Sequence, residues 1–257
     1  MNIEGILAPN AGPMTGPGTN SWVVRSGDES VLIDPGPIIE SHLDAIRQAL
    51  HETTVRAVLV THNHPDHAPA ANPLAAEYGA PAIGNRPGPE FRPDRRIADG
   101  ESVGFGALQA VCVETPGHTP ESVSYRIRDA LFVGDHIMGG STVMVEDMGD
   151  YLNSLRKLQS IGLEALYPGH GPVIDAPEVV IAEYVAHRLE REDQILSALA
   201  GGAGSVGAIV SDIYRDVDPA LHPAAAVSVV AHLAKLRRDG LVETAAEPSW
   251  DSAVRLR

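Results

Sequence analysis

The chain has 257 residues, of which 44% are hydrophobic, so it can form one large domain or a medium-sized domain with a small second one. Its formal net charge of −15 argues against a broad surface for nucleic-acid phosphates, because such binding needs an excess of Lys and Arg. The single cysteine, Cys112, excludes an internal disulfide, and no apolar run approaches the length of a transmembrane helix.

Short apolar runs alternate with turn signals and helical stretches over the first 175 residues. The runs 22–24 and 31–33 predict a β-hairpin that turns at Gly27-Asp28. Helical apolar spacing predicts helices over 41–50 and 151–158. Further strands are predicted over 57–60, 110–113 and 131–133. Strands interleaved with helices indicate a layered α/β architecture.

After residue 175 the pattern becomes mainly helical. Helices are predicted over 178–199, 206–214 and 224–238. Residues 241–242 and 253–254 then flank a polar turn around Pro248, which predicts a second β-hairpin. Helices followed by a hairpin favour a small winged-helix module. We therefore expect a catalytic domain over 1–175 and a helical, winged-helix domain over 176–257.

The motif with the strongest chemical meaning is His62-Asn63-His64-Pro65-Asp66-His67, directly after the strand that ends at Val60. Imidazole nitrogens and carboxylate oxygens are good zinc ligands, and a tight turn at a strand end can direct them to one point. Proline stiffens that turn. This spacing predicts a metal site.

Three more ligand-type residues follow strand-like runs, each with glycine beside it. They are His118 after Thr115-Pro116-Gly117, Asp135 after Gly134, and His170 after Tyr167-Pro168-Gly169. Sites in α/β sheets gather outside the carboxyl ends of strands. We therefore expect these side chains to converge on the motif.

On these motifs the chain resembles the metallo-β-lactamase superfamily, with its His-x-His-x-Asp-His core, third His, Asp and last His in that order. It is more specifically similar to the β-lactamase-like protein 2 group, also in Tyr151-Leu152-Asn153-Ser154-Leu155 and in 183–188, which lead towards a winged helix. The resemblance covers essentially the whole chain. It implies a four-layer αββα fold with a small C-terminal winged-helix domain.

The resemblance also implies two zinc ions per chain with seven protein ligands. The first zinc would be bound by His62, His64 and His118, the second by Asp66, His67 and His170, and Asp135 would bridge both. Asp34, in Ile33-Asp34-Pro35-Gly36, matches an early aspartate of the family that braces the ligand loop without touching metal.

Two zinc ions about 3.5–4 Å apart can share a hydroxide that acts as the nucleophile, because each lowers the pKa of bound water. Asp66 is the candidate catalytic residue that would orient the hydroxide or transfer its proton. Two Zn²⁺ less two aspartates and the hydroxide leave a local charge of about +1. Such a site suits an ester, thioester, lactone or phosphodiester.

Two other chemistries of this fold are disfavoured. Diiron relatives typically carry glutamate at the second motif position, where this chain has His64, and a flavin-binding domain would not fit in the short tail. Antibiotic-hydrolysing relatives commonly carry cysteine where this chain has Asp135, and a secretion signal is not evident. We expect a cytoplasmic enzyme without membrane contact.

Two substrate classes remain possible. A homodimer is also possible. The family similarity favours endonucleolytic cleavage of single-stranded RNA, whereas the acidic charge favours hydrolysis of a small-molecule acyl ester or thioester. In the third C-terminal helix the basic residues Lys235, Arg237 and Arg238 stand only at the end, which disfavours DNA reading. A metal-stabilised winged-helix regulator is a distant third alternative.

The remaining candidates are interpreted as structural. The basic cluster Arg86, Arg92, Arg95 and Arg96 favours a solvated loop over a grip on an anionic substrate. Cys112 is expected in the core. Surface or helix-packing positions are expected for His42, His51, His187, His222 and His232, and His136 is expected to point away from the metals.

Overall fold

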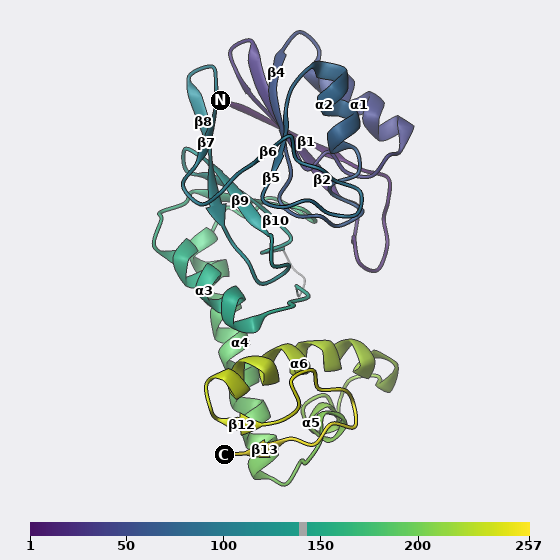
Figure 1. Ribbon diagram of the computed structural model, residues 1–257, viewed down its shortest axis with the longest axis vertical. Coiled ribbons are helices and arrows are strands. Elements are labelled where there is room, and N and C mark those ends of the chain that lie inside the picture. Colours follow the sequence, from purple (N-terminus) through teal and green to yellow (C-terminus); the bar gives the residue numbers. More distant parts are fainter. Residues whose placement is uncertain (139–142) are drawn as a thin grey trace. The chain divides into compact units, whose positions relative to one another are not determined.

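The computed structural model describes residues 1–138 and 143–257 (Figure 1). The chain divides into two compact units. The first comprises Met1–Pro116, Glu121–Val143 and Ile161–Glu178, and the second Gly117–Pro120, Met144–Ser160 and Val179–Arg257.

The first unit contains a six-stranded mixed sheet in the order β1-β2-β3-β4-β5-β6. Its strands are β1 (Asn2–Leu7), β2 (Asn20–Ser26), β3 (Glu29–Ile33), β4 (Thr54–Leu59), β5 (Ala82–Gly84) and β6 (Arg95–Arg96). The first three strands pair antiparallel, and β3 to β6 pair parallel. The parallel part brings the carboxyl ends of neighbouring strands to the same edge of the sheet.

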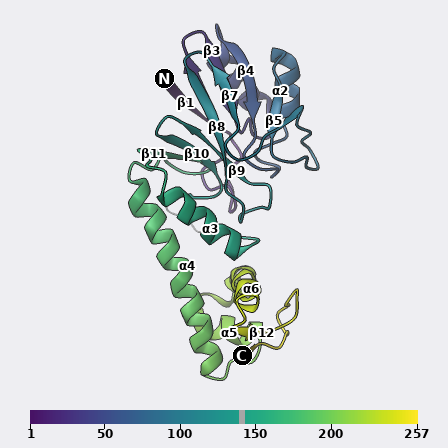
Figure 2. The ribbon, with the colours of Figure 1, turned by 60° about the vertical axis from the view of Figure 1, so that its left-hand side comes forward.

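A second, five-stranded sheet has the order β11-β10-β9-β8-β7. Its strands are β7 (Ser102–Phe105), β8 (Leu108–Glu114), β9 (Val123–Ile127), β10 (Ala130–Gly134) and β11 (Ala165–Pro168). Only the pair of β10 and β11 is parallel. Consequently the residues that follow β10 and β11 also leave the sheet at one edge, where Figure 2 shows the two strands side by side.

The two sheets enclose the main hydrophobic core. On β4, Ala57 and Leu59 face this core, whereas Val58 and the next residue after the strand, Val60, face the opposite side of the sheet, as the two-residue period of a strand requires. From the second sheet, Phe132 stacks on Tyr167 with ring centroids 4.8 Å apart. Cys112 lies in the same core, which confirms its predicted burial.

Two helices cover the outer face of the six-stranded sheet, namely α1 (Glu40–Leu50) and α2 (Ala71–Tyr78). On α1 the buried residues Leu43, Ile46 and Leu50 recur at helical spacing and form one apolar stripe. This stripe packs against Val58 and its neighbours on the sheet. The first unit therefore has the α, β and β layers that the sequence predicts.

The second unit is mainly helical. Its elements are α3 (Met148–Gln159), most of α4 (Pro177–Ala200), α5 (Val206–Ile213), a 3₁₀ turn (Pro219–Leu221), α6 (His222–Arg238), β12 (Val242–Glu243) and β13 (Arg255–Leu256). Figure 2 shows α4 along its full length. Apolar side chains of α4, α5 and α6 form a core with Val242 and Val254. The β12–β13 pair is antiparallel, as a wing requires.

The predicted helices and the two predicted hairpins are present, with ends that differ by a few residues. The basic segment 86–96 is not only a loop, because Arg95 and Arg96 form the edge strand β6. Helix α3 and the loop 117–120 lie within the predicted catalytic segment 1–175, yet they group with the C-terminal helices. None of the helices in the described part of the chain is both long and apolar enough to cross a bilayer.

Ile46 provides a test of the outer helix layer. It is fully buried between α1 and the sheet, so Ile46→Ala should lower the free energy of unfolding by about 2–5 kcal/mol. Ile38, just before α1, is 62% exposed, and Ile38→Ala should change stability by less than about 0.5 kcal/mol. The two variants can be compared by urea denaturation followed by circular dichroism. Equal losses in the free energy of unfolding would contradict this packing.

Candidate metal centre

The predicted ligands lie in loops that follow strands. The His62–His67 segment follows β4, and Asp34 follows the neighbouring parallel strand β3. Asp135 follows β10, and His170 follows its parallel partner β11. The parallel pairing in each sheet explains why residues distant in sequence meet at one place.

The described residues form three groups of potential ligands, and in each group the ligand atoms lie within 4.8 Å of one another. The groups are His62, His64, His118 and Asp135; Asp66, His67 and His170; and Asp34, His62 and His67. All seven predicted ligands occur in the first two groups. Their division matches the two-metal assignment, which stays a prediction.

Short distances connect the groups. The Nε2 atom of His67 lies 3.4 Å from Nε2 of His170 and 3.3 Å from Oδ1 of Asp135. Oδ2 of Asp66 lies 3.2 Å from Nε2 of His170, and Oδ2 of Asp135 lies 3.3 Å from the same nitrogen. Nε2 of His62 lies 3.0 Å from Nδ1 of His64. Asp135 belongs to one group and also contacts the histidines of another, as a bridging ligand would.

Asp34 binds the backbone and side chains of the ligand loop. Its Oδ1 accepts a hydrogen bond of 2.7 Å from the backbone N–H of Thr61, and its Oδ2 accepts one of 2.7 Å from the Thr61 hydroxyl. Nδ1 of His67 donates to Oδ2 of Asp34 at 3.1 Å. Asp34 has a φ of 49°, in the left-handed region that aspartate tolerates better than most residues. This is the bracing role that the family resemblance implies.

Outward hydrogen bonds fix the orientation of four histidine rings. Since carbonyl and carboxylate oxygens only accept, Nδ1 of His67, His118 and His170 must donate to Asp34, to the Met144 carbonyl at 2.7 Å and to the Gly18 carbonyl at 3.0 Å, respectively. Nδ1 of His62 lies 3.0 Å from the Thr61 hydroxyl, whose proton is donated to Asp34, so this nitrogen also donates. In a neutral ring Nε2 then carries a lone pair that can bind metal.

This donor set fits a divalent metal. The Nε2 lone pairs of His67 and His170 face the carboxylates of Asp66 and Asp135, so four electron-pair donors meet within hydrogen-bond range. Groups that can only accept repel one another unless a proton or a metal cation lies among them. Nitrogen and oxygen ligands of this kind suit zinc and related transition metals.

The pKa shifts show how strongly the site attracts positive charge. Burial disfavours a charged His67, yet Asp135, Asp34 and Asp66 raise the pKa of this ring well above its ordinary value. Burial likewise opposes charge on His170, but hydrogen bonds to Asp135 and Asp66 raise its pKa to about 9. The same histidines hold the pKa of both aspartates well below the usual range, although burial acts in the opposite direction. Protons and metal ions therefore compete for these nitrogens.

Gly169 permits the close approach of the second sheet to the motif. A Cβ atom at this position would collide with the Asp135 carboxylate and with the His67 ring. The Gly169 N–H donates to the Gly134 carbonyl at 2.8 Å, which joins the loops after β11 and β10. The glycine beside His170 therefore has a packing role in the site.

Sequence reasoning missed several groups around the ligands. The Thr19 hydroxyl donates to Oδ2 of Asp66 at 2.9 Å, and the carbonyls of Gly18 and Met144 orient two histidines. Backbone carbonyls have no sequence signal, and Thr19 lies 47 residues from its partner. His136 is buried and belongs to none of the three donor groups of the described residues. His42 and His232 are buried on helices, whereas His51 and His187 are exposed.

Comparison with known families decides the assignment. The model of the metallo-β-lactamase superfamily matches residues 14–170, and the model of the β-lactamase-associated winged-helix domain matches residues 205–250. The chain belongs to the metallo-β-lactamase superfamily. It is a metal-dependent hydrolase of that superfamily with a C-terminal winged-helix domain, which confirms the predicted fold.

Curated relatives differ in what their names state. A β-lactamase-like protein 2 homolog from Caenorhabditis elegans is 31% identical, over 94% of this chain and 86% of the relative. An atrochrysone carboxyl ACP thioesterase from Aspergillus chevalieri is 34% identical, over 76% of this chain and 64% of its own length. A solved metallo-β-lactamase family protein from Thermus thermophilus has a TM-score of 0.79 and 19% identity, and the match covers 99% and 98% of the two chains. This last likeness concerns the fold.

Asp34→Asn tests the bracing contact. An asparagine amide can accept from Thr61 with its oxygen, but its NH₂ group would then oppose the Nδ1–H of His67. Relief requires the other tautomer of His67, whose protonated Nε2 cannot bind metal. We expect metal affinity to fall by about 10–100-fold, measured by competition with a chromogenic chelator. Asp28→Asn, in an exposed turn, is the control, and equal affinities for the two variants would refute the role of Asp34.

Proposed function

We propose that this protein is a dinuclear zinc hydrolase that cleaves acyl thioesters. The observation that carries the proposal is the convergence of five histidines and two aspartates in two donor groups that share contacts through Asp135. Two zinc ions in such a set would polarise the substrate carbonyl and activate a water molecule at neutral pH. The reaction adds water across the C–S bond, so that a carboxylic acid and a thiol are released.

Asp66 is the residue that we assign to proton transfer. Its side chain is 23% exposed, compared with 9% for Asp135, so water reaches Asp66 more easily. The Thr19 hydroxyl holds Oδ2 of Asp66 in place from the side of β2. A carboxylate that is fixed yet accessible can accept the proton of the attacking water and exchange it with solvent.

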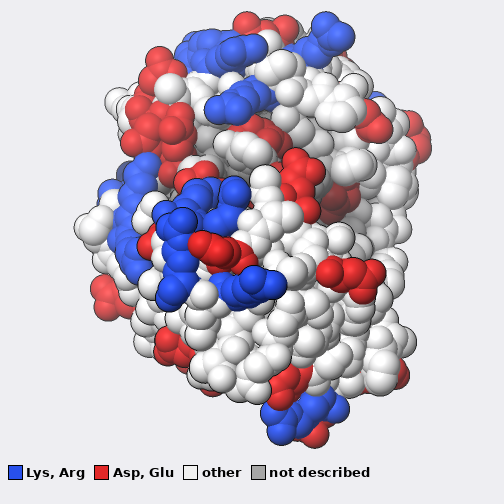
Figure 3. Space-filling model, turned by 60° about the horizontal axis from the view of Figure 1, so that its bottom comes forward, with Lys and Arg blue, Asp and Glu red and all other residues white. Residues whose placement is uncertain are grey.

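Charge favours a small acyl substrate over a polyanion. The chain has 19 basic and 34 acidic residues, so its field repels RNA at long range. On the face shown in Figure 3, Lys and Arg side chains gather in groups that adjoin Asp and Glu side chains. In α6 the half that would enter a DNA groove contains the uncharged residues 223–230. The relative named as a thioesterase also supports this substrate class.

Cleavage of single-stranded RNA is the second candidate. The similarity to the two β-lactamase-like protein 2 homologs extends over 94% and 91% of the chain, which is more than the 76% that the thioesterase match covers. The resemblance to that group implies a nuclease. The local positive charge of a two-zinc centre can also bind a phosphodiester.

A substrate panel separates the two candidates. The zinc-loaded protein is incubated with acyl thioesters of coenzyme A and N-acetylcysteamine, with a lactone and with single-stranded RNA. Released thiol is measured with a chromogenic disulfide reagent, to which the buried Cys112 contributes little. We expect thioester turnover, and Asp135→Ala should lower kcat/KM by more than about 100-fold. Asp129→Ala, in an exposed turn, should retain activity. RNA cleavage without thiol release would replace this proposal with the nuclease.

Metal content is a separate prediction. Protein purified with added zinc should contain two zinc ions per chain by mass spectrometry of the metals, and chelation should lower its melting temperature because the native site binds metal more tightly than the unfolded chain does. The Asp135→Ala variant should retain fewer ions than the wild type. Less than one metal ion per wild-type chain would refute the dinuclear centre.

A further inference from the structure

The loop that carries His118 rests on the segment just before α3. The backbone N–H groups of Glu146 and Asp147 both donate to the Gly117 carbonyl, at 2.8 and 3.1 Å. Nδ1 of His118 donates to the Met144 carbonyl at 2.7 Å. All these residues belong to the second compact unit. Segment 144–147 is therefore the platform that orients His118.

The contact between loop and platform is close. Gly117 has a φ of 132°, which L side chains rarely adopt, and a Cβ atom there would collide with the backbone of Tyr151 in the first turn of α3. The loop backbone thus lies directly on the start of α3. A shift of segment 144–147 must move Gly117, and with it His118.

Asp147 is the fixed point of the platform. It is the N-cap of α3, and its Oδ1 accepts from the Asp150 N–H at 3.0 Å. The guanidinium of Arg238, in the last turn of α6, donates to both carboxylate oxygens at 2.5 and 2.6 Å. This fork geometry fixes direction as well as distance. Arg238 also lowers the pKa of Asp147.

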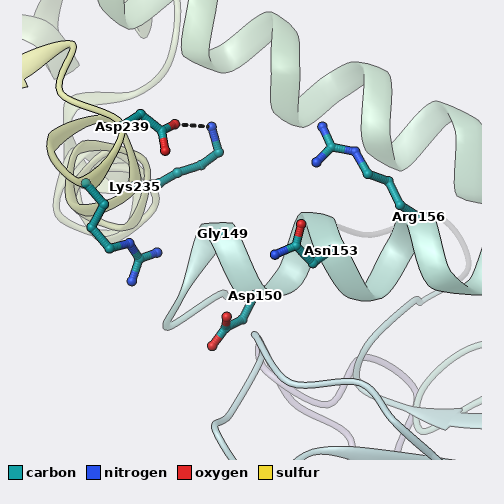
Figure 4. Close-up of a pocket in the computed structure, with 7 residues that line it drawn as sticks. Gly149, Asp150, Asn153, Arg156, Lys235 and Asp239 are labelled. Atoms are coloured by element: carbon teal, nitrogen blue, oxygen red, sulfur yellow. Dashed lines mark hydrogen bonds and ion pairs between the residues drawn. The ribbon is translucent and has the colours of Figure 1, made fainter.

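The residues around this ion pair leave space for it, and the pair is exposed to water. A Cβ atom at Gly149 would lie 2.7 Å from Nη2 of Arg238, so glycine leaves room for the guanidinium. Beside the pair, α3 and α6 line a pocket of about 380 Å³, where Figure 4 shows Lys235 bound to Asp239. Solvent-exposed ion pairs contribute little to stability. We therefore expect this pair to matter mainly because it fixes the position of Asp147.

We propose that Arg238 of the winged-helix domain is a positioning residue for the metal centre: by gripping Asp147 it holds the platform that orients His118. The C-terminal domain would thereby influence metal affinity without providing a ligand. The inference rests on the metal role proposed for His118. It assigns to the segment at the start of α3, which contains no metal ligand, the function of orienting His118.

The test measures zinc affinity by chelator competition and the visible spectrum of the cobalt-substituted protein. Arg238→Ala should weaken the binding of one metal ion by about tenfold and alter the cobalt absorption bands. Arg237→Ala is the matched control, since it removes the neighbouring exposed arginine of the same helix and should change neither measurement. Arg238→Lys keeps the charge but loses the fork and should show an intermediate loss.

Asp147→Asn completes the test, because asparagine still caps α3 but no longer attracts the guanidinium. If Arg238 acts through Asp147, the double variant should lose no more affinity than either single variant. Additive losses, or an Arg238→Ala protein that binds zinc as tightly as Arg237→Ala, would overturn the inference. A wild type without metal would instead refute the proposed function. A melting temperature close to that of the wild type shows that the variants are folded.

Discussion

The carboxylate of Asp34 is the interaction on which the site depends. It accepts hydrogen bonds from the backbone N–H and the hydroxyl of Thr61, the residue just before the ligand motif, and from Nδ1–H of His67. Because the Thr61 proton is thereby used, the hydroxyl can only accept from His62. One buried carboxylate thus determines the tautomers of two histidines in two different donor groups. Its own position follows from the parallel pairing of β3 with β4, which places the two loops next to each other.

Other parts of the fold also determine the tautomer and orientation of ligand histidines. A metal-binding imidazole usually donates its other ring N–H to a hydrogen-bond acceptor, and the structure supplies such acceptors from separate segments. Gly18 precedes β2, Met144 precedes α3, and Asp34 follows β3. His170, His118 and His67 are therefore tied to three different parts of the chain. Because the ligands come from separate segments, a cation bound there should also stabilise the fold.

The sequence indicates the candidate ligands more clearly than the groups that support them. His62, His64, Asp66 and His67 stand in a dense motif, and His118, Asp135 and His170 each follow an apolar run that reads as a strand. The supporting atoms are mostly carbonyls, which every residue has, so their roles depend on tertiary packing and leave no pattern. The strand over 57–60 was predicted from a continuous apolar run, which arises because the two faces of β4 meet two different apolar cores. The grouping of α3 with the C-terminal helices could not be predicted, because it depends on tertiary contacts between segments far apart in the chain, such as Arg238 and Asp147, which are separated by 91 residues.

The acidic surface and the candidate metal centre have different consequences for substrate choice. A field from 15 excess negative charges slows the approach of any polyanion, whereas it affects a neutral acyl group very little. Selection of the proposed thioester substrate would then depend on short-range chemistry, namely a polarised carbonyl and a thiol that is a good leaving group. A phosphodiester offers the metals a stronger charge interaction, but a long RNA must bring many further phosphates against the acidic body. High salt screens that repulsion, so a nuclease with this surface would bind RNA better as salt rises, which is the reverse of ordinary nucleic-acid binding. The balance of charge in the chain therefore favours the small acyl substrate.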